Sequence, residues 1–556
     1  MFSSVDTMWV LIAAALVFFM QAGFAMVETG FTRAKNSANI IMKNLMDFCI
    51  GSIAYWMIGF GIMFGVSMGG LIGFPDFFVQ GNYDSTIPTA TFLIFQTVFC
   101  ATAATIVSGA MAERTKFSAY CAYSIIISAV IYPISGHWIW GGGWLSNLGF
   151  HDFAGSTAVH MVGGIAAFIG ALILGPRIGK YNSKGEAQAI PAHNLIIGAL
   201  GVFILWFGWF GFNGGSTVSA TGDDILISIG SIFINTNLAA AAAATGTMII
   251  TWIKYKKPDV SMTLNGALAG LVAITAGCDA VSPLGAFLIG IITSLVMVFG
   301  IELIDKKLKV DDPVGAVGVH GLCGATGTIL TGVFALEGGF AYGGGLRMVG
   351  IQLIGVISVG VFIAITMTIV FQIIKHTMGL RVSREEELIG LDTFEHDLLS
   401  SYADFMPIGE NHHLVNVEKK ISESLQAINT SKNKDAKISK VEIYANQNKF
   451  DELKEAMNQI GITGMTVTQV HGCGAQNGRK DYYRGVKLEM KLLPKICIEI
   501  IVSKVPVRTV IETASAILKT GSVGDGKIFV YDVENAIRIS TGEEGYDALQ
   551  YKGSRE

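Results

Sequence analysis

Residues 152–164 read Asp-Phe-Ala-Gly-Ser-Thr-Ala-Val-His-Met-Val-Gly-Gly, and residues 312–324 read Asp-Pro-Val-Gly-Ala-Val-Gly-Val-His-Gly-Leu-Cys-Gly. The Asp, the first Gly, the Val, the His and the last Gly recur at the same spacing in both stretches. A match of five positions in a chain with 67 glycines can arise by chance. Its meaning therefore depends on where the two copies fall in the architecture.

Each copy opens a long apolar segment, and the chain holds eleven such segments. A helix needs about 20 mostly apolar residues to cross a bilayer. Windows of that kind lie near residues 8–27, 45–66, 91–110, 117–135, 156–175, 193–212, 225–250, 262–279, 283–303, 315–336 and 345–374. The two copies fall at the fifth and tenth windows, and a five-span unit that returns after five spans must come back inverted. The sequence therefore predicts an all-α polytopic membrane unit of eleven transmembrane helices, arranged as a 5+5 inverted repeat.

The loops between the windows alternate in positive charge. The loops after windows 2, 4, 6 and 8 contain no Lys or Arg, whereas those after windows 1, 3, 5, 7 and 9 do: Arg33, Lys35 and Lys43; Arg114 and Lys116; Arg177, Lys180 and Lys184; Lys254, Lys256 and Lys257; Lys306, Lys307 and Lys309. Positively charged loops face the cytoplasm. We therefore expect a multi-pass protein of the cell (inner) membrane, with the N-terminus outside and the C-terminal part in the cytoplasm.

Composition divides the chain into two parts. Of the charged side chains, 33 lie in residues 1–375 and 49 lie in the last 181 residues, so an apolar part precedes one with the charge content of a soluble domain. The net charge of −4 shows no basic excess, so nothing points to nucleic acid as a partner. The seven cysteines form no Cys-x-x-Cys pair, and most lie in apolar runs, where a free Cys behaves as a small buried hydrophobe.

His160 and His320 are the histidines that fall well inside predicted spans. Ionisable groups within a membrane usually mark a translocation path. Two of them at equivalent positions of a repeat favour a shared functional site over simple helix packing. A facing imidazole pair can share one proton while it handles a small polar guest. The same pair could bind a metal, but two ligands without a Cys or carboxylate alongside make a poor site, so we expect none.

Asp152 opens the fifth span shortly after the Trp-Gly-Gly-Gly-Trp run of residues 140–144. Its carboxylate can cap the helix by accepting backbone N–H groups, or it can attract a cation directly, and the two roles are compatible. Trp140, Phe99 and Phe212 are the aromatic side chains that we place near the pathway. Aromatic residues near span ends more often serve as interface anchors or in packing, so composition alone does not settle this.

Several motifs carry a family resemblance over residues 1–400. They are Phe-Cys-Ala-Thr-Ala-Ala-Thr-Ile-Val-Ser-Gly-Ala-Met-Ala-Glu-Arg from Phe99, Trp140-Gly-Gly-Gly, Asp152-Phe-Ala-Gly-Ser-Thr with His160, Gly208-Trp-Phe-Gly-Phe-Asn-Gly-Gly-Ser216, Val319-His320-Gly and Gly390-Leu-Asp-Thr-Phe-Glu-His396. The sequence resembles the ammonium transporter (Amt/Mep/Rh) family. The resemblance implies a lipid-embedded homotrimer of eleven-helix bundles, with one narrow pore per subunit and ammonium as substrate.

The resemblance also implies a role for each matching residue. Trp140 and Ser216 would form the external recruitment site for ammonium, with Phe99 and Asp152 beside them. Phe99 and Phe212 would stack as a gate, and His160 with His320 would line the pore. These roles are physically sensible, because an aromatic face and a hydroxyl can replace water around a small cation, whose charge makes a dry pore costly to enter.

The rest of the chain reads as a soluble domain behind a linker. We assign residues 1–404 to the membrane domain with its cytoplasmic tail, 405–437 to a linker and 438–556 to a separate domain. Strands are expected at 440–445, 464–472, 495–502 and 527–533, and helices at 448–459 and 506–519. The order β-α-β-β-α-β is an α+β ferredoxin-like double unit. The long polar segment 473–492 is unusual in so small a domain, and such loops are usually functional.

Three runs in this domain resemble PII-type signal transduction proteins. They are Gly461-Ile-Thr-Gly-Met-Thr-Val-Thr468, Tyr483-Arg-Gly485 and Gly521-Ser-Val-Gly-Asp-Gly-Lys-Ile-Phe-Val530. The resemblance implies a trimer that binds ATP or ADP between subunits. The close glycines, including Gly524 and Gly526, would let backbone N–H groups approach phosphates, and Lys527 and Arg538 would contact them. Gln476 and Lys495 match positions that would serve Mg-ATP and 2-oxoglutarate.

Three departures from the PII pattern limit this assignment. Ser540 stands where a second phosphate-binding Arg is expected, and Asn477 replaces the Lys that usually follows Gln476. Leu488 replaces the Tyr that many bacterial members modify, so that covalent switch is not expected. The preference between ADP and ATP, and the binding of 2-oxoglutarate, are left open.

Together the two parts predict ammonium transport regulated in cis by nucleotide. In the family, PII-type trimers dock under the transporter and insert the Arg of the long loop into the cytoplasmic pore mouth, and Arg484 matches that Arg. The alternative is an ammonium receptor that signals through the PII-type domain with little flux. An enzyme is not expected, since the chain has no P-loop Gly-Lys-Ser/Thr and no evident catalytic base.

Overall fold

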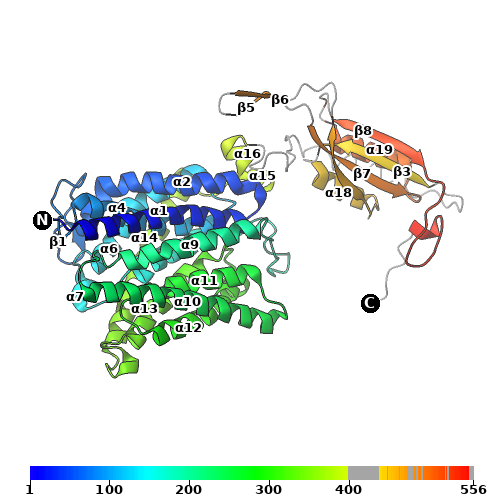
Figure 1. Ribbon diagram of the computed structural model, residues 1–556. Coiled ribbons are helices and arrows are strands. Elements are labelled where there is room, and N and C mark those ends of the chain that lie inside the picture. The colour runs from blue at the N-terminus through cyan, green and yellow to red at the C-terminus, as the bar shows by residue number, and fades with distance from the viewer. Residues whose placement is uncertain are drawn as a thin grey trace. The chain divides into compact units, whose positions relative to one another are not determined.

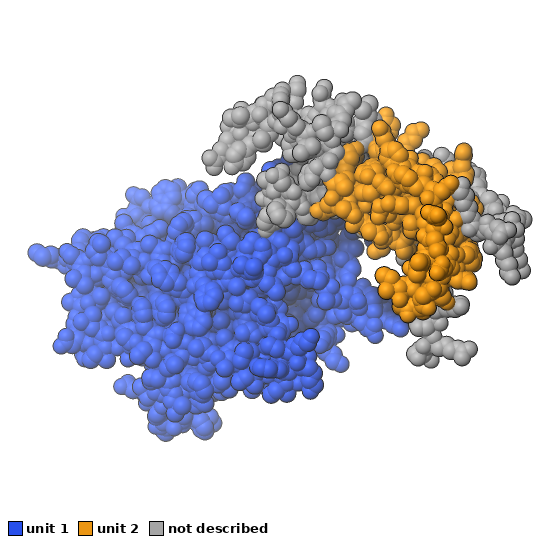
Figure 2. All heavy atoms as spheres, turned by 45° about the vertical axis from the view of Figure 1, so that its right-hand side comes forward, with its two compact units in different colours: residues 1–398 blue, residues 399–556 orange. Residues whose placement is uncertain are grey.

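The computed structural model describes residues 1–398, 438–446, 449–462, 464–472, 480–483, 486–489, 493–519, 521 and 525–549. The chain divides into two compact units, residues 1–398 and residues 399–556 (Figures 1 and 2). Unit 1 is a bundle of long helices, and unit 2 is built on an antiparallel sheet.

Among the described residues, ten helical segments are long and apolar enough to cross a membrane. The remaining predicted span is α11 (Val260–Ile274), whose 15 residues extend about 22 Å and are followed by turns at residues 275–280. This confirms the predicted polytopic helical bundle. In chain order its main segments are α1 Ser4–Phe31, α2 Ser37–Ala54 with α3 Phe60–Phe64, α4 Thr89–Met111, α5 Phe117–Ile126 with α6 Tyr132–Ile139 and α7 Trp144–Leu148, η4 Ser156–Met161 with α8 Val162–Leu174, α9 Leu195–Gly215, α10 Asp223–Tyr255, α11, α12 Pro283–Glu302, η6 Val317–Leu322 with α13 Cys323–Phe334, and α14 Arg347–Thr377.

Several of these helices begin at side chains suited to cap them. Ser3 Oγ accepts the N–H of Asp6 at the start of α1, and Asn194 Oδ1 accepts the N–H of Ile197 at the start of α9. Ser282 Oγ caps α12 in the same way. Such side chains satisfy N–H groups that have no partner within the helix, which matters most where little water is available.

The first helices of the two repeats, α1 and α9, lie side by side through small residues (Figure 1). A Cβ on Gly30 would lie 2.4 Å from the backbone nitrogen of Gly198, and a Cβ on Gly201 would lie 2.6 Å from the carbonyl oxygen of Gly23. Their backbones therefore touch, which is how membrane helices gain van der Waals contact in the absence of a hydrophobic driving force.

The two segments that carry the sequence repeat run in opposite directions. α8 ends where Arg381 Nη1 donates to the carbonyl of Leu174, at the end of the bundle on which residues 381–398 pack, here called the tail end. η6 begins at that same end and α13 runs back towards the end that holds the N-terminus. A Cβ on Gly164 would lie 2.1 Å from the backbone nitrogen of Gly321, and one on Gly324 would lie 2.5 Å from the carbonyl oxygen of Ser156. These reciprocal contacts are those of an inverted repeat.

A cluster of buried charged side chains holds the loops at the tail end together. Arg177 donates from Nε and Nη2 to Asp311 at 2.8 and 2.9 Å and from Nη1 to Glu113 at 2.6 Å. Arg33 pairs with the same Glu113, and Arg114 donates to the carbonyl of Asp311 at 2.7 Å. Burial alone would raise the pKa of Asp311, but the hydrogen bonds and charge of Arg177 and the charge of Arg114 hold it well below its usual range. This tail-end charge cluster joins the loops after spans 1, 3, 5 and 9.

Two short helices, α15 (Arg384–Ile389) and α16 (Leu391–His396), continue the chain across this end. The carboxylate of Asp392 accepts the N–H groups of Ala38 and Asn39 at 3.0 and 2.8 Å. Lys35 Nζ donates to the carbonyl of Glu387 at 2.8 Å. The tail is therefore hydrogen-bonded to the beginning of α2.

Unit 2 contains a four-stranded antiparallel sheet in the order β4-β7-β3-β8. Its elements are β3 Ser439–Ala445, α18 Phe450–Gln459, β4 Thr466–Gly472, β7 Leu493–Val502, α19 Val507–Leu518 and β8 Gly526–Asp532. This confirms the predicted β-α-β-β-α-β order. The predicted long loop 473–492 also holds a short hairpin of β5 (Lys480–Tyr483) and β6 (Val486–Glu489), which the sequence did not predict.

The two faces of this sheet differ. Val441, Ile443 and Ile498 point into a core shared with α18 and α19. The alternate residues share the opposite face, where Lys440 lies between Ile501 and Tyr531, and Glu442 lies between Glu499 and Phe529. Phe529 and Tyr531 are more than a third exposed, so this face leaves large aromatic side chains uncovered.

Candidate functional site

Both copies of the repeat begin with the same hydrogen-bonded cap. Asp152 accepts the N–H groups of Gly155, Thr157 and Ala158 at 3.0, 2.9 and 2.8 Å. In the second copy, Asp312 accepts the N–H groups three, four and five residues later at 3.1, 3.1 and 2.7 Å. Burial raises the pKa of Asp152, and it raises that of Asp312 to about 6, in each case against these hydrogen bonds. Each carboxylate thus holds the first turn of a histidine-bearing segment.

The recurring glycine of the motif has a backbone reason. Gly155 and Gly315 have φ values of 111° and 84°, in the left-handed region that glycine enters without strain. This conformation turns the chain directly behind the aspartate. The Asp-x-x-Gly spacing of the repeat is therefore a helix-start motif, and it places a histidine at the same point of each segment.

The two histidines meet where the repeats cross. His160 Nδ1 and His320 Nδ1 are 3.3 Å apart, and the rings are stacked with centroids 5.3 Å apart. The relative exposure of His160 is 0% and that of His320 is 5%. His160 Nε2 is buried and has no hydrogen-bond partner among the described residues. One proton shared between the two Nδ1 atoms gives each of them a hydrogen-bond partner. The Nε2 atoms are then left to interact with a passing molecule.

Aromatic rings close the pathway on the N-terminal side of the histidines. Phe99 and Phe212 are stacked with centroids 4.1 Å apart, and Phe212 lies 5.4 Å from the His160 ring. The Trp140 ring lies edge-on to Phe99 at 6.2 Å, and its Nε1 donates to the carbonyl of Asp152 at 2.7 Å. The structure thus brings three predicted aromatic residues, Trp140, Phe99 and Phe212, together in one column with His160.

Ser216 lies one helical turn beyond Phe212, at the end of α9. Its Oγ donates to the carbonyl of Phe212 at 2.9 Å, which leaves the hydroxyl oxygen able to accept. The hydroxyl is half-buried. Its position is compatible with a recruitment role next to the aromatic column, and the role itself stays a prediction.

Sequence reasoning assigned no role to two further aromatic residues. Trp209 stacks on His160 at 4.9 Å and donates from Nε1 to Thr275 Oγ1 at 2.8 Å. Phe24 lies 6.1 Å from the His320 ring. They come from α9 and α1, the first helices of the two repeats. Neither residue belongs to the repeated Asp-x-x-Gly motif, so the repeat alone gave no signal for them.

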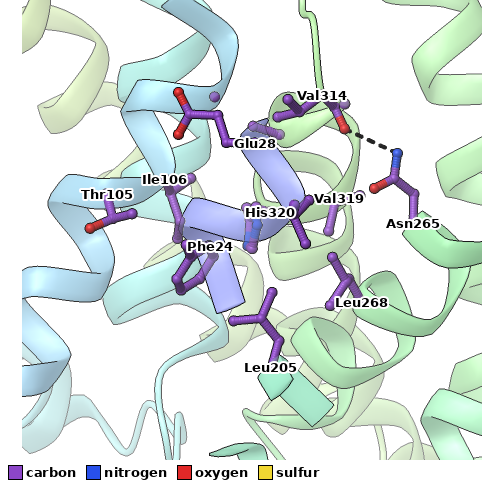
Figure 3. Close-up of a pocket in the computed structure, with 14 residues that line it drawn as sticks. Phe24, Glu28, Thr105, Ile106, Leu205, Asn265, Leu268, Val314, Val319 and His320 are labelled. Atoms are coloured by element: carbon purple, nitrogen blue, oxygen red, sulfur yellow. Dashed lines mark hydrogen bonds between the residues drawn. The ribbon is translucent and has the colours of Figure 1, made fainter. Parts of the chain in front are cut away.

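On the tail side of His320 the pathway opens into a cavity (Figure 3). Most of its lining is aliphatic, and the polar side chains that reach it are those of Glu28, Thr105, Asn265 and His320. Thr105 Oγ1 donates to Gln21 Oε1 at 2.9 Å, and Asn265 Nδ2 donates to the carbonyl of Val314 at 3.0 Å. The two sides of the histidine pair are therefore different, with packed rings on one and open space on the other.

Comparison with known proteins identifies the family that shares this architecture. Residues 8–400 match the Ammonium Transporter Family. The chain belongs to this family. It is 49% identical over 425 residues to ammonium transporter Amt2 of Archaeoglobus fulgidus, covering 72% of this chain and 89% of that protein. It is 36% identical to an ammonium transporter of Bacillus subtilis, covering 70% of this chain and 97% of the relative.

Solved structures agree with this placement. A structure titled "Sensor Amt Protein" superposes with a TM-score of 0.67 at 42% identity, covering 70% of this chain and 98% of that chain. Mep2 of Candida albicans superposes with a TM-score of 0.64 at 27% identity, covering 69% and 88%. Residues 438–543 match the family of nitrogen regulatory protein P-II. Both predicted resemblances are thus confirmed.

The predicted ligand residues of the P-II domain are only partly described. Gly526 has φ 124° and begins β8, and Lys527 follows it opposite Tyr444. Arg538 Nη1 pairs with Glu543 at 3.0 Å, and Nε and Nη2 donate to the carbonyl of Ala548. Lys495 lies on β7 opposite Val470. Gln476, Arg484 and Gly524 lie outside the described residues.

Proposed function

We propose that the chain transports ammonium across the cell membrane through the column of Phe99, Phe212, His160 and His320. The observation that carries the proposal is the buried histidine pair, with Nδ1 atoms 3.3 Å apart, at the crossing of the two repeats. Ammonium is a small cation with four N–H donors. It can be held at an aromatic and hydroxyl mouth and can lose a proton where its charge is no longer solvated.

This mechanism gives selectivity a chemical basis. The unpartnered Nε2 of His160 is suited to accept a proton from ammonium, and its Nδ1 contacts the ring of His320. Neutral ammonia can then cross the apolar section at little cost. Potassium has no proton to give, so the desolvation of its charge opposes its entry.

Purified protein in liposomes tests this proposal. The wild type should take up ammonium and exclude potassium, and the double substitution of His160→Ala and His320→Ala should lose that discrimination. Thr157→Val serves as a matched control, because Thr157 lies on the same turn and its hydroxyl contacts Thr328. Unchanged selectivity in the double variant contradicts the relay.

The proposal includes the orientation and assembly of the chain. We place the N-terminal end of the bundle outside and the tail end, with the P-II domain, in the cytoplasm, because the Lys- and Arg-rich loops gather at the tail end. We also propose a homotrimer. The uncovered sheet face of unit 2, with exposed Phe529 and Tyr531, supports an interface between copies. Cross-linking of the detergent-solubilised protein should give a trimer.

The P-II domain is proposed to regulate the pore in cis. Adenine nucleotide would bind at the loop before β8 through Lys527 and Arg538, with Mg and 2-oxoglutarate as candidate further ligands at Gln476 and Lys495. Arg484 would enter the cytoplasmic pore mouth. A tether of about 30 residues would hold the domain at roughly millimolar effective concentration, so control would not depend on the abundance of a partner.

Two comparisons test this regulation. Lys527→Ala should weaken ATP and ADP binding about tenfold or more, because a charge-assisted phosphate contact is lost, whereas Lys519→Ala should not. Arg484→Ala should abolish the effect of nucleotide on uptake, whereas Lys487→Ala, which removes the same charge from the same loop, should retain it. If nucleotide effects persist without Arg484, the loop does not block the pore.

A receptor is the second candidate, favoured by the 42% identity to a structure titled as a sensor. In that case ammonium binding would change the P-II domain and little flux would follow. The same liposomes decide between the two. Uptake that scales with protein supports transport, and ammonium binding without uptake supports the receptor.

A further inference from the structure

The cavity on the tail side of His320 contains one acidic side chain, that of Glu28 (Figure 3). It belongs to α1, one turn beyond Phe24, the residue whose ring lies 6.1 Å from that of His320. Four residues of α-helix advance about 6 Å. Glu28 therefore lies about one turn from the residue that adjoins His320, in the same cavity as His320.

The carboxylate of Glu28 is buried and its hydrogen-bond donors are neutral. Its exposure is 4%. Oε1 accepts from Ser108 Oγ at 2.6 Å, and Oε2 accepts from Asn44 Nδ2 at 3.0 Å. Lys43, the neighbour of Asn44 on α2, directs its Nζ to the carbonyl of Thr115 at 3.1 Å, so it acts on Glu28 through its charge and not through a hydrogen bond. A carboxylate can accept about four hydrogen bonds, so this one keeps acceptor sites for a further group.

A buried carboxylate with neutral donors is costly inside a membrane unless function uses it. The other polar side chains of the cavity are committed elsewhere, since Thr105 and Asn265 donate to protein acceptors. Glu28 and His320 are thus the two groups in the cavity that can exchange a proton. A chain of water in a cavity with polar lining can connect such groups.

We propose that Glu28 is the proton acceptor at the tail end of the pore. This inference rests on the proposed transport function and adds the fate of the proton. An N–H bond of ammonium breaks as its proton bonds to His160 Nε2, the proton shared by the two Nδ1 atoms moves to His320, and the resulting imidazolium of His320 releases a proton to a carboxylate oxygen of Glu28. That O–H bond then breaks as ammonia takes the proton back. The products are ammonium, neutral imidazoles and the carboxylate, so one charge crosses with each molecule.

The test compares current with uptake in liposomes that hold the full-length protein. Glu28→Gln keeps the size and the hydrogen-bonding ability of the side chain but cannot ionise. The ammonium-dependent current should fall on the order of 100-fold, the scale of a lost acid–base group, while uptake of labelled methylammonium continues as neutral amine. Asp47→Asn is the nearby control. That variant tests the surroundings of Glu28, because Asp47 also interacts with Glu28 and with Thr105 of the cavity lining. Asp6→Asn is the remote control: it neutralises a buried carboxylate of unit 1 that accepts from Ser219 and Thr221 at the start of α1, and should keep the wild-type ratio of current to uptake.

Each other outcome has a definite meaning. A wild-type current-to-uptake ratio in Glu28→Gln overturns the proposal. If Glu28→Gln loses both signals, Glu28→Asp decides, because Asp can still ionise. If Glu28→Asp restores the wild-type ratio of current to uptake, the role of Glu28 as proton acceptor is supported. If Glu28→Asp is monodisperse but also loses both signals, Glu28 has a packing role and the proposal is overturned. If the wild-type protein takes up ammonium without a current, the role of Glu28 as proton acceptor is overturned but the transport function stands. If the wild-type protein shows no uptake, the transport function itself is contradicted.

Discussion

The two histidine-bearing segments share a backbone design but differ in the side chains that cover them. In each of them an aspartate caps the first turn and a glycine with positive φ follows the aspartate. On the N-terminal side, stacked Phe99 and Phe212 cover His160, whereas on the tail side a cavity with Glu28 adjoins His320. The repeat therefore sets where the histidines lie, and the side chains outside the repeat make the two sides of the histidine pair different.

The largest expected effect tests the shared backbone. Gly164→Ala places a Cβ 2.1 Å from the backbone nitrogen of Gly321, and backbone on both sides leaves little room to adjust. We expect little folded protein. Gly321→Ala is the matched change, because its Cβ would meet its neighbours at 3.4 Å, an ordinary contact. Size-exclusion profiles in detergent check both, and a monodisperse Gly164→Ala protein would contradict the close crossing.

The two caps should be equivalent in stability. Asp152→Ala and Asp312→Ala each leave three buried N–H groups without their acceptor, and an unsatisfied buried group costs roughly 1–3 kcal/mol. Thermal unfolding in detergent should show a similar loss for each variant. A loss for only one of them would mean that the two segments are not built alike. If the losses match but Asp152→Ala alone slows uptake, Asp152 also attracts the cation.

The aromatic rings over His160 should exclude cations more strongly than the side chain of Phe24 beside His320. Phe212→Ala removes one ring of the stack over His160 and should let cations larger than ammonium pass, raising their leak about fivefold, since each such aromatic pair contributes about 1 kcal/mol beyond its buried area. Phe24→Ala, beside an existing cavity, should change leak little. Flux of tetramethylammonium, which has no proton to give, measures both, and equal leaks would contradict a one-sided seal.

The smallest expected effect concerns pH at the tail end. The folded pKa of Asp311 is lowered, so its contribution to stability is present above its unfolded pKa of roughly 3.9 and is lost as pH falls through the folded value. Unfolding temperature should therefore drop in acid, and Asp311→Asn should flatten that dependence while lowering stability at neutral pH. An unchanged acid dependence in the variant would assign it to other groups.

Much of this architecture could be predicted because it follows from patterns that lie within short stretches. Apolar windows gave the spans, and the Asp-x-x-Gly motif with its His gave the inverted repeat. The alternation in unit 2 gave the sheet. The length of α11 was less predictable, because the window 262–279 is mostly apolar, and the helix ends at Ile274 where residues 275 and 276 bond to residues 153–156 instead. The hairpin β5–β6 was also hard to predict, because it lies in a stretch of polar residues.

The site was predictable where chemistry is concentrated in a motif, and not where it depends on facing helices. Phe99, Phe212 and the two histidines lie in motifs, and the structure brings them together. Glu28 stands alone at the end of the first span, and its meaning depends on Ser108 and Asn44, which come from other helices. Neither spacing nor composition connects those three residues.

The backbone contact of α1 with α9 has a consequence for synthesis. α1 leaves the ribosome first, but the surface that Gly23 and Gly30 present finds its partner only after residues 195–215 have been made. The first five spans must therefore wait in the lipid, with this glycine surface of α1 unpaired, until the sixth arrives. The period between the synthesis of α1 and the synthesis of α9 is therefore the stage at which the nascent chain most needs protection by an insertase or chaperone.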